Sequence, residues 1–108
     1  MISASRGIAR ILKAEGTEFV SLFPSCKVNN GIGDEGGIPI IMMRDERYGV
    51  AVADAYSRLG DGKRFGVTTL LGGLNCAGFQ FGLGALHQAF EDSSPLLAFT
   101  DGVNPGDM

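Results

Sequence analysis

The stretch Ile40-Ile41-Met42-Met43-Arg44-Asp45-Glu46-Arg47, continuing as Tyr48-Gly-Val-Ala-Val-Ala-Asp-Ala-Tyr-Ser-Arg58, decides the fold of this 108-residue chain. Its first four residues are apolar and predict a short strand that stops at an acidic pair and turns at once into a helix. In open α/β sheets, ligands bind at the carboxyl ends of the strands. The sequence therefore places Glu46 at the edge of a sheet where a ligand is expected.

Helical and apolar extended segments alternate on both sides of this stretch. Helices are predicted over residues 5–15, 45–59 and 80–91, strands over 19–23, 38–43, 65–71 and 95–100, and a loop or poorly formed helix over 25–37. The strands lack polar alternation, which is typical of parallel strands buried by crossover helices. We expect an α/β fold, a three-layer doubly wound parallel sheet with helices on both faces and about four strands, in one domain over residues 1–108.

Composition excludes several classes of function. The net charge is -3 and no basic tract is present, which argues against nucleic acid and anionic membranes as partners. No apolar run approaches a membrane span and no signal peptide is visible, so a cytoplasmic domain is expected. Cys26 and Cys76 lack the CxxC spacing of a zinc site, and a disulfide between them cannot be inferred from sequence.

Each candidate functional residue also has a plain structural explanation. Asp45 and Glu46 could simply complement the positive end of the helix dipole, which contributes about 0.3 to 1 kcal/mol. Pro24 could be an ordinary strand terminator, and the glycine-rich loop 72–78 a turn without ligand. His87, the sole histidine, is expected to be packed or at the surface rather than catalytic.

The later glycines favour packing over nucleotide binding. Gly82-Leu83-Gly84 lacks the third glycine of a dinucleotide fingerprint and lies inside a predicted helix. We expect Gly78, Gly82 and Gly84 to let this helix pack closely against its neighbours. Gly60-Asp61-Gly62 is expected to be the turn that ends the preceding helix.

Three segments resemble the enzymes that use thiamine diphosphate, in particular the acetolactate-synthase-like group and its relatives. Residues 38–58 are similar to the part that holds the aminopyrimidine ring of the cofactor. Gln88-Ala89-Phe90 and Asp92-Ser93-Ser94-Pro95 resemble the family's Gln-Ala-aromatic and Asp-Ser-x-Pro ending. The similarity extends from about Gly16 to Val103, and it implies a pyrimidine-binding domain that is truncated relative to the family domain.

The resemblance gives Glu46 a catalytic role. In these enzymes a glutamate at the end of the second strand bonds the N1′ nitrogen of the aminopyrimidine and thereby promotes loss of the thiazolium C2 proton. Such a carboxyl group needs an apolar, water-poor site. The four apolar residues 40–43 just before Glu46 suit that requirement.

The resemblance also implies that loops after the first and third strands approach the cofactor. It points to Pro24, Ser25, Gly72, Gly73 and Asn75, together with Glu46, as cofactor-binding residues.

The third-strand loop departs from the family's Gly-Pro-Gly turn. Leu74 stands in place of proline and Asn75 in place of the second glycine, and the interval to Asp92 is about three residues longer. Counting back from Asp92 without a gap places residues 76–78 at the turn instead. The backbone contacts to the pyrimidine therefore stay open at this point.

Family members carry the diphosphate-binding function on a separate domain that holds Mg²⁺. Gly60-Asp61-Gly62 is similar to the start of the metal-diphosphate motif but follows the wrong helix. We therefore expect thiamine diphosphate as cofactor, Mg²⁺ held by a domain absent from this chain, and no metal ligands here. The expected partner is a diphosphate-binding domain or subunit in a homo- or hetero-oligomer.

The function implied is the cofactor-binding portion of a 2-oxo acid decarboxylase or carboligase, a lyase or transferase that this chain alone would not complete. The alternative is a non-catalytic α/β module that keeps the fold as an assembly or dimerisation surface.

Overall fold

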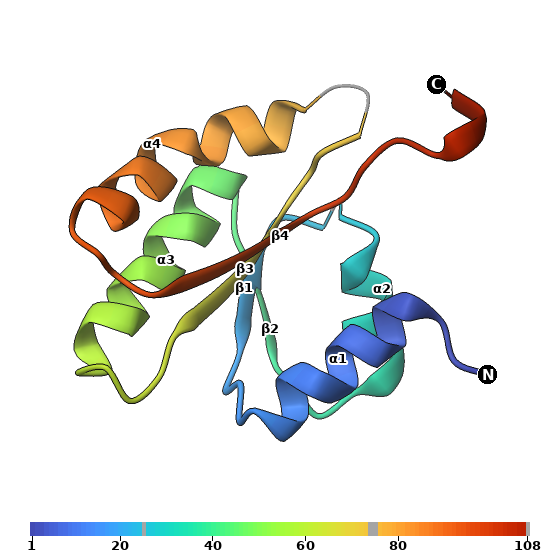
Figure 1. Ribbon diagram of the computed structural model, residues 1–108, viewed down its shortest axis with the longest axis horizontal. Coiled ribbons are helices and arrows are strands. Elements are labelled where there is room, and N and C mark those ends of the chain that lie inside the picture. The colour runs from blue at the N-terminus through green and yellow to red at the C-terminus, as the bar shows by residue number, and fades with distance from the viewer. Residues whose placement is uncertain (25, 74–75, 108) are drawn as a thin grey trace.

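The computed structural model describes residues 1–24, 26–73 and 76–107. Along the chain lie α1 (Ala4–Ala14), β1 (Val20–Leu22), α2 (Val28–Glu35), β2 (Ile40–Met42), α3 (Glu46–Leu59), β3 (Gly66–Leu70), α4 (Ala77–Glu91), β4 (Leu96–Thr100) and the 3₁₀ turn η1 (Pro105–Asp107) (Figure 1). This alternation confirms the predicted α/β class.

The four strands form one parallel sheet in the order β2-β1-β3-β4. Helices α1 and α2 pack together on one face, and α3 and α4 pack together on the other (Figure 1). The predicted three-layer, doubly wound arrangement is therefore confirmed. Because all strands run the same way, the loops that follow them meet at one edge of the sheet.

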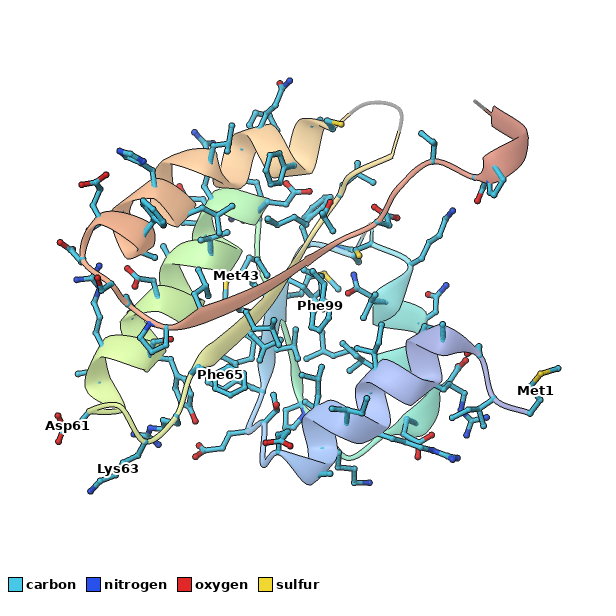
Figure 2. The ribbon with its side chains drawn as sticks, viewed as in Figure 1. Met1, Met43, Asp61, Lys63, Phe65 and Phe99 are labelled. Atoms are coloured by element: carbon cyan, nitrogen blue, oxygen red, sulfur yellow. The ribbon has the colours of Figure 1, made fainter. Side chains whose placement is uncertain are left out.

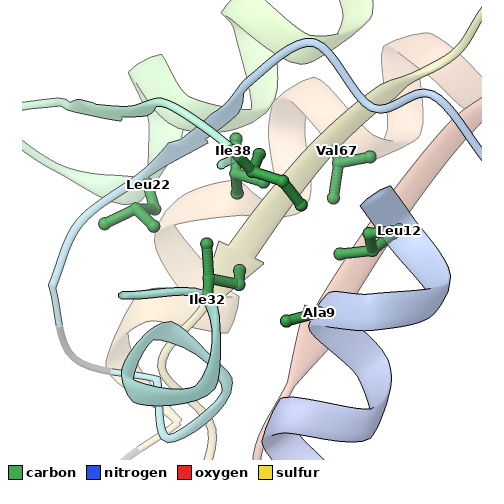
Figure 3. Close-up of a cluster of buried hydrophobic side chains, with 7 residues drawn as sticks. Ala9, Leu12, Leu22, Ile32, Ile38 and Val67 are labelled. Carbon is green, nitrogen blue, oxygen red and sulfur yellow. The ribbon is translucent and has the colours of Figure 1, made fainter. Parts of the chain in front are cut away.

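The core between the sheet and the α1–α2 layer is an apolar cluster. Its buried members are Ala9, Leu12, Val20, Leu22, Ile32, Ile38 and Val67, six of which are labelled in Figure 3. Phe99 of β4 packs on the same cluster and lies on the α1 side of the sheet (Figure 2). Burying each large aliphatic side chain contributes about 1.5 to 3 kcal/mol, so this cluster fixes the position of the sheet beneath the two helices.

On the opposite face, α3 lies directly on the backbone of β3. A Cβ atom on Gly66 would overlap the Ala53 backbone, so only glycine permits this approach. The buried Ser57 hydroxyl donates to the Ala53 carbonyl (3.0 Å) and accepts from the Gly66 amide (2.7 Å). This bridge holds the helix that begins at Glu46 at a fixed height above the sheet.

Two details differ from the sequence expectation. The strand before Glu46 is not buried: Ile40, Ile41 and Met42 are 40, 42 and 66% exposed, because β2 is an edge strand of the sheet formed by the described residues. Helix α4 begins at Ala77, three residues before the predicted start at residue 80. The apolar sequence of β2 therefore does not create a water-poor site by itself.

The segment 25–37, expected to be a loop or a poorly formed helix, contains the regular helix α2, and the 3₁₀ turn η1 lies at Pro105–Asp107, where a loop was expected. Within the described ranges, no helix is long and apolar enough to cross a membrane.

Candidate functional site

The candidate site lies at the carboxyl edge of the sheet, where the loops after β1, β2, β3 and β4 emerge. Pro24 is exposed in the first loop, and Gly72 and Gly73 form the third. Ser25 and Asn75, also predicted to bind cofactor, lie outside the described residues. The edge therefore brings together segments that are up to 77 residues apart in sequence, as the contact of Lys27 with Asn104 illustrates.

Glu46 is the first residue of α3, and its neighbour Asp45 is the N-cap. The Asp45 carboxylate accepts from the Arg47 amide at 2.9 Å, the usual way of satisfying a free amide at a helix start. The Arg47 guanidinium hydrogen-bonds the same carboxylate and holds the pKa of Asp45 below its ordinary value. Asp45 thus fixes the helix start from which Glu46 projects.

The Glu46 side chain is buried although the preceding strand is exposed; the residue is only 4% accessible. Its carboxylate lies against the first turn of α4, where a Cβ atom on Gly78 would overlap Oε1 of Glu46. The same Cβ would lie 2.6 Å from the Leu71 nitrogen. The expectation that the apolar residues 40–43 give Glu46 its water-poor surroundings is therefore wrong. Helix α4 covers Glu46, and the missing side chain of Gly78 makes room for it.

The start of α4 is fixed to the end of β3 by backbone hydrogen bonds. The Phe79 amide donates to the Leu71 carbonyl at 2.9 Å, and the Cys76 amide donates to the Gly72 carbonyl at 3.2 Å. Cys76 adopts the left-handed conformation at the N-cap and gives no side-chain cap to the helix. The first turn of α4, which packs against the Glu46 carboxylate, is therefore held to the end of β3 through the backbone.

Gly72 and Gly73 have different reasons to be glycine. A Cβ atom on Gly72 would overlap the carbonyl oxygen of Asp101 and the Thr100 hydroxyl. Gly73 has a positive φ of 63°, a conformation that glycine adopts without strain. These two predicted residues are thus held at the edge by close contact and by backbone geometry.

Asp101, which the sequence analysis missed, connects these loops. Its Oδ1 accepts from the Gly72 amide at 2.8 Å, its Oδ2 from the Lys27 amide at 3.3 Å, and its carbonyl oxygen from the Gly73 amide at 2.9 Å. Burial raises the pKa of the adjacent Cys26 thiol, and the negative charge of Asp101 adds to that rise. An acidic residue directly after a predicted strand, the pattern that drew attention to Glu46, was the available signal.

A second missed residue, Asn29, ties the first loop to the sheet. Its amide group donates to the Phe23 carbonyl at 3.3 Å, and its oxygen accepts from the Thr69 hydroxyl at 2.7 Å. The backbone just before Pro24 is therefore fixed relative to β3. Thr69 lies forty residues from Asn29 in sequence, so no local pattern marks this contact.

The remaining motifs lie away from Glu46 in sequence, on α4 and in the turn after α3. His87 is exposed, with Nε2 3.7 Å from the Glu91 carboxylate. The segment 60–62 is the turn after α3, with positive φ at Asp61 and Gly62, and Figure 2 shows Asp61 extending away from the protein. No group of three metal-ligating side chains occurs in the part of the chain that the structure describes.

Two hollows lie away from the candidate site. One, of about 340 Å³, is lined by Glu18, Tyr56 and Arg64 at the amino ends of the strands. The other, of about 240 Å³, is an apolar groove between α1 and β4, next to Phe65 and Phe99 (Figure 2). Neither of these two hollows is lined by Glu46, Gly72 or Gly73.

The residues at the edge fit an aminopyrimidine ring. Glu46 supplies a buried carboxylate of the kind that can share a proton with a ring nitrogen, and the loop after β3 approaches the same edge with glycine at 72 and 73, whose amides donate to Asp101. Such a ring has both hydrogen-bonding edges and flat apolar faces, which suits a site with few convergent polar groups.

Comparison with known proteins agrees with this geometry. Residues 2–107 match the family described as thiamine pyrophosphate enzyme, N-terminal TPP binding domain. No curated protein matches the chain well enough to count as a relative. Because the family match spans nearly the whole chain and the parallel α/β fold agrees with it, the chain belongs to the thiamine pyrophosphate enzymes and carries their N-terminal TPP-binding domain.

Proposed function

We propose that this chain is the pyrimidine-binding part of a thiamine-diphosphate-dependent 2-oxo acid decarboxylase or carboligase of the acetolactate-synthase-like type. The observation that carries the proposal is the buried Glu46 carboxylate at the carboxyl edge of the sheet, enclosed by the end of β3 and the first turn of α4. When bound, the cofactor supplies a thiazolium carbon that attacks 2-oxo acids.

In this proposal Glu46 holds a proton between its carboxylate and the N1′ nitrogen of the ring. Burial of the Glu46 side chain limits the access of water to that proton. Pro24 and the loop of Gly72 and Gly73 approach the ring, and Ser25 and Asn75 complete the predicted contacts. The chain's own residues thereby orient the ring and move one proton.

The site needs a partner that holds the cofactor's diphosphate, and we propose a diphosphate-binding domain or subunit that carries Mg²⁺. Large apolar side chains lie exposed on the two helices beside Glu46: Tyr48, Phe79, Phe81 and Leu83, at 55, 38, 51 and 46%. Exposed apolar groups gathered beside a functional edge mark an interaction surface. Their position supports docking of the partner over the start of α3 and α4.

An NMR titration of the ¹⁵N-labelled chain with thiamine diphosphate and Mg²⁺ tests the proposal, because it detects weak binding without a partner. The expected shifts occur at the amides of residues 71–73 and at Glu46, and they are lost in the Glu46→Gln variant while its spectrum stays folded. Absence of shifts at millimolar cofactor, or shifts confined to the opposite edge of the sheet, would overturn the proposal.

In the enzyme completed by its partner, Glu46→Gln is expected to lower turnover by orders of magnitude with the fold intact. General acid–base catalysis alone contributes about 10²- to 10⁴-fold. Turnover close to that of the wild type would remove Glu46 from the mechanism.

The second candidate function is a non-catalytic assembly module. Its support is that β2 and β4 are the edge strands of the described sheet, and that Phe90 of α4 is 79% exposed. Open edges and apolar surface favour self-association. Light scattering over a concentration series separates the two: a stable oligomer that ignores the cofactor supports assembly, and a strict monomer excludes it.

A further inference from the structure

We propose that Asp101 is a positioning residue that fixes the cofactor-side loops of this chain, an inference that rests on the proposed function. Asp101 follows β4 and makes no predicted contact with the cofactor itself. Its role is to hold the glycine loop after β3 and the chain entering α2 in one arrangement, so that the backbone groups facing the ring are set before the ring arrives.

The contacts of Asp101 join the loop after β3 to the chain that enters α2. The two carboxylate oxygens accept from different loops, Oδ1 from the Gly72 amide at 2.8 Å and Oδ2 from the Lys27 amide at 3.3 Å. Lys27 follows β1 and Gly72 follows β3, so the carboxylate joins the segments after two neighbouring strands, in addition to the Asn29–Thr69 hydrogen bond. Hydrogen bonds from amides to a charged acceptor are about twice as strong as neutral ones.

The backbone of Asp101 reinforces the same arrangement. Its carbonyl oxygen accepts from the Gly73 amide at 2.9 Å and packs so closely on Gly72 that no side chain fits there. The Lys27 ammonium reaches the Asn104 side chain at 2.6 Å, which fastens the segment after Asp101 to the start of α2. Movement of Asp101 would therefore carry the loop of Gly72 and Gly73 with it.

Amide hydrogen exchange on the isolated chain tests the loop contacts directly. In Asp101→Ala, the Gly72 and Lys27 amides are expected to exchange at least about tenfold faster, as loss of a charge-assisted hydrogen bond predicts. Amides in the middle of β3, such as Val67, are expected to keep their protection. Asp34→Ala, which removes an exposed carboxylate from α2, is the control and should change neither set.

The conservative variant Asp101→Asn separates positioning from general stability. Asparagine keeps one acceptor oxygen, and the shorter contact predicts that it faces the Gly72 amide while its NH₂ group faces Lys27. Gly72 protection should therefore survive and Lys27 protection should be lost. In the titration with thiamine diphosphate and Mg²⁺, Asp101→Ala should weaken binding about tenfold and Asp101→Asn by less than about threefold.

The outcomes distinguish this inference from the proposed function. Unchanged exchange of the Gly72 and Lys27 amides in Asp101→Ala would show that the Asp101 carboxylate does not hold these two segments, and it would overturn the inference. Faster exchange with unchanged cofactor affinity would show that the hydrogen bonds of Asp101 to Gly72 and Lys27 stabilise the loops without affecting cofactor binding, which also overturns the positioning role. If the wild-type chain shows no cofactor shifts while its exchange pattern follows the prediction, the proposed function fails, and the role of Asp101 in cofactor binding fails with it.

Discussion

Replacing Gly78 by alanine tests the central contact of the candidate site, because the added methyl group has no room. Its Cβ atom would lie less than 3.0 Å from both the Glu46 carboxylate and the Leu71 nitrogen. The carboxylate ends a flexible side chain and can swing away. The Leu71 nitrogen is backbone leaving β3, so it moves only if the loop moves. The variant should therefore displace Glu46 and strain the start of α4.

The magnitude follows from two opposing effects. Overpacking a filled site costs about 1 to 3 kcal/mol. Exchanging glycine for alanine inside a helix gains up to about 1 kcal/mol, and less in the first turn, where Gly78 lies. The same exchange at Gly84, on the same helix, meets no atom within 4 Å and should keep the whole gain. The free energies of unfolding of the two variants should thus differ by about 1 to 4 kcal/mol, with Gly84→Ala more stable than wild type.

Urea unfolding followed by circular dichroism measures that difference, and the cofactor titration measures its effect on the site. Gly78→Ala should lose the shifts at Glu46 and at residues 71–73, whereas Gly84→Ala should retain them. Equal stabilisation by both substitutions would refute the reasoning, because it would mean that Gly78 is not packed against Glu46 and Leu71.

Two further predictions concern the scaffold. Ser57→Ala leaves the buried Gly66 amide without its acceptor and should lower the free energy of unfolding by about 1 to 3 kcal/mol in urea; an unchanged midpoint would contradict the bridge. The guanidinium of Arg10, assisted by that of Arg6, holds the pKa of Glu35 below its ordinary value. The stabilisation by these ion pairs between α1 and α2 should therefore be fully present above the unfolded pKa of about 4.3. It should be lost as the pH falls through the lower folded pKa. A ¹³C titration of the Glu35 carboxyl checks the direction of the shift, and a midpoint at or above the ordinary value would contradict it.

The fold was predictable because its signals are local. Apolar runs separated by helical segments specify parallel strands with crossovers, and the turn at Gly16, with φ of 79°, ends the first helix where expected. Gly78 and Gly82 do face close neighbours, as predicted, whereas Gly84 does not. The difference arises from which side of α4 faces α3 and the sheet, and glycine content alone does not reveal that side.

The site was predictable only in part because its contacts join distant segments. The position of Glu46 after a strand was readable, but its burial comes from α4, more than thirty residues later, and not from the adjacent apolar strand. The role of Asn29 was not readable because it depends on a hydrogen bond to Thr69, forty residues away. Asp101 did follow a predicted strand, but its partners, Lys27 and Gly72, are distant in sequence. Local pattern indicates where a strand ends, and tertiary contact decides which groups meet there.

The two countings of the glycine loop against the family's Gly-Pro-Gly turn lead to glycines with different surroundings. Counted forward from β3, with Leu74 in place of proline, the first glycine is Gly73, which has a φ of 63° and where an added Cβ atom would meet nothing closer than 3.9 Å. Counted back from Asp92, the turn falls on residues 76–78, and there Gly78 packs against the Glu46 carboxylate. Only the backward counting therefore leads to a glycine whose missing side chain makes room for Glu46. The close packing beside the carboxylate thus depends on Gly78 at the start of α4, and a departure from Gly-Pro-Gly directly after β3 does not remove it.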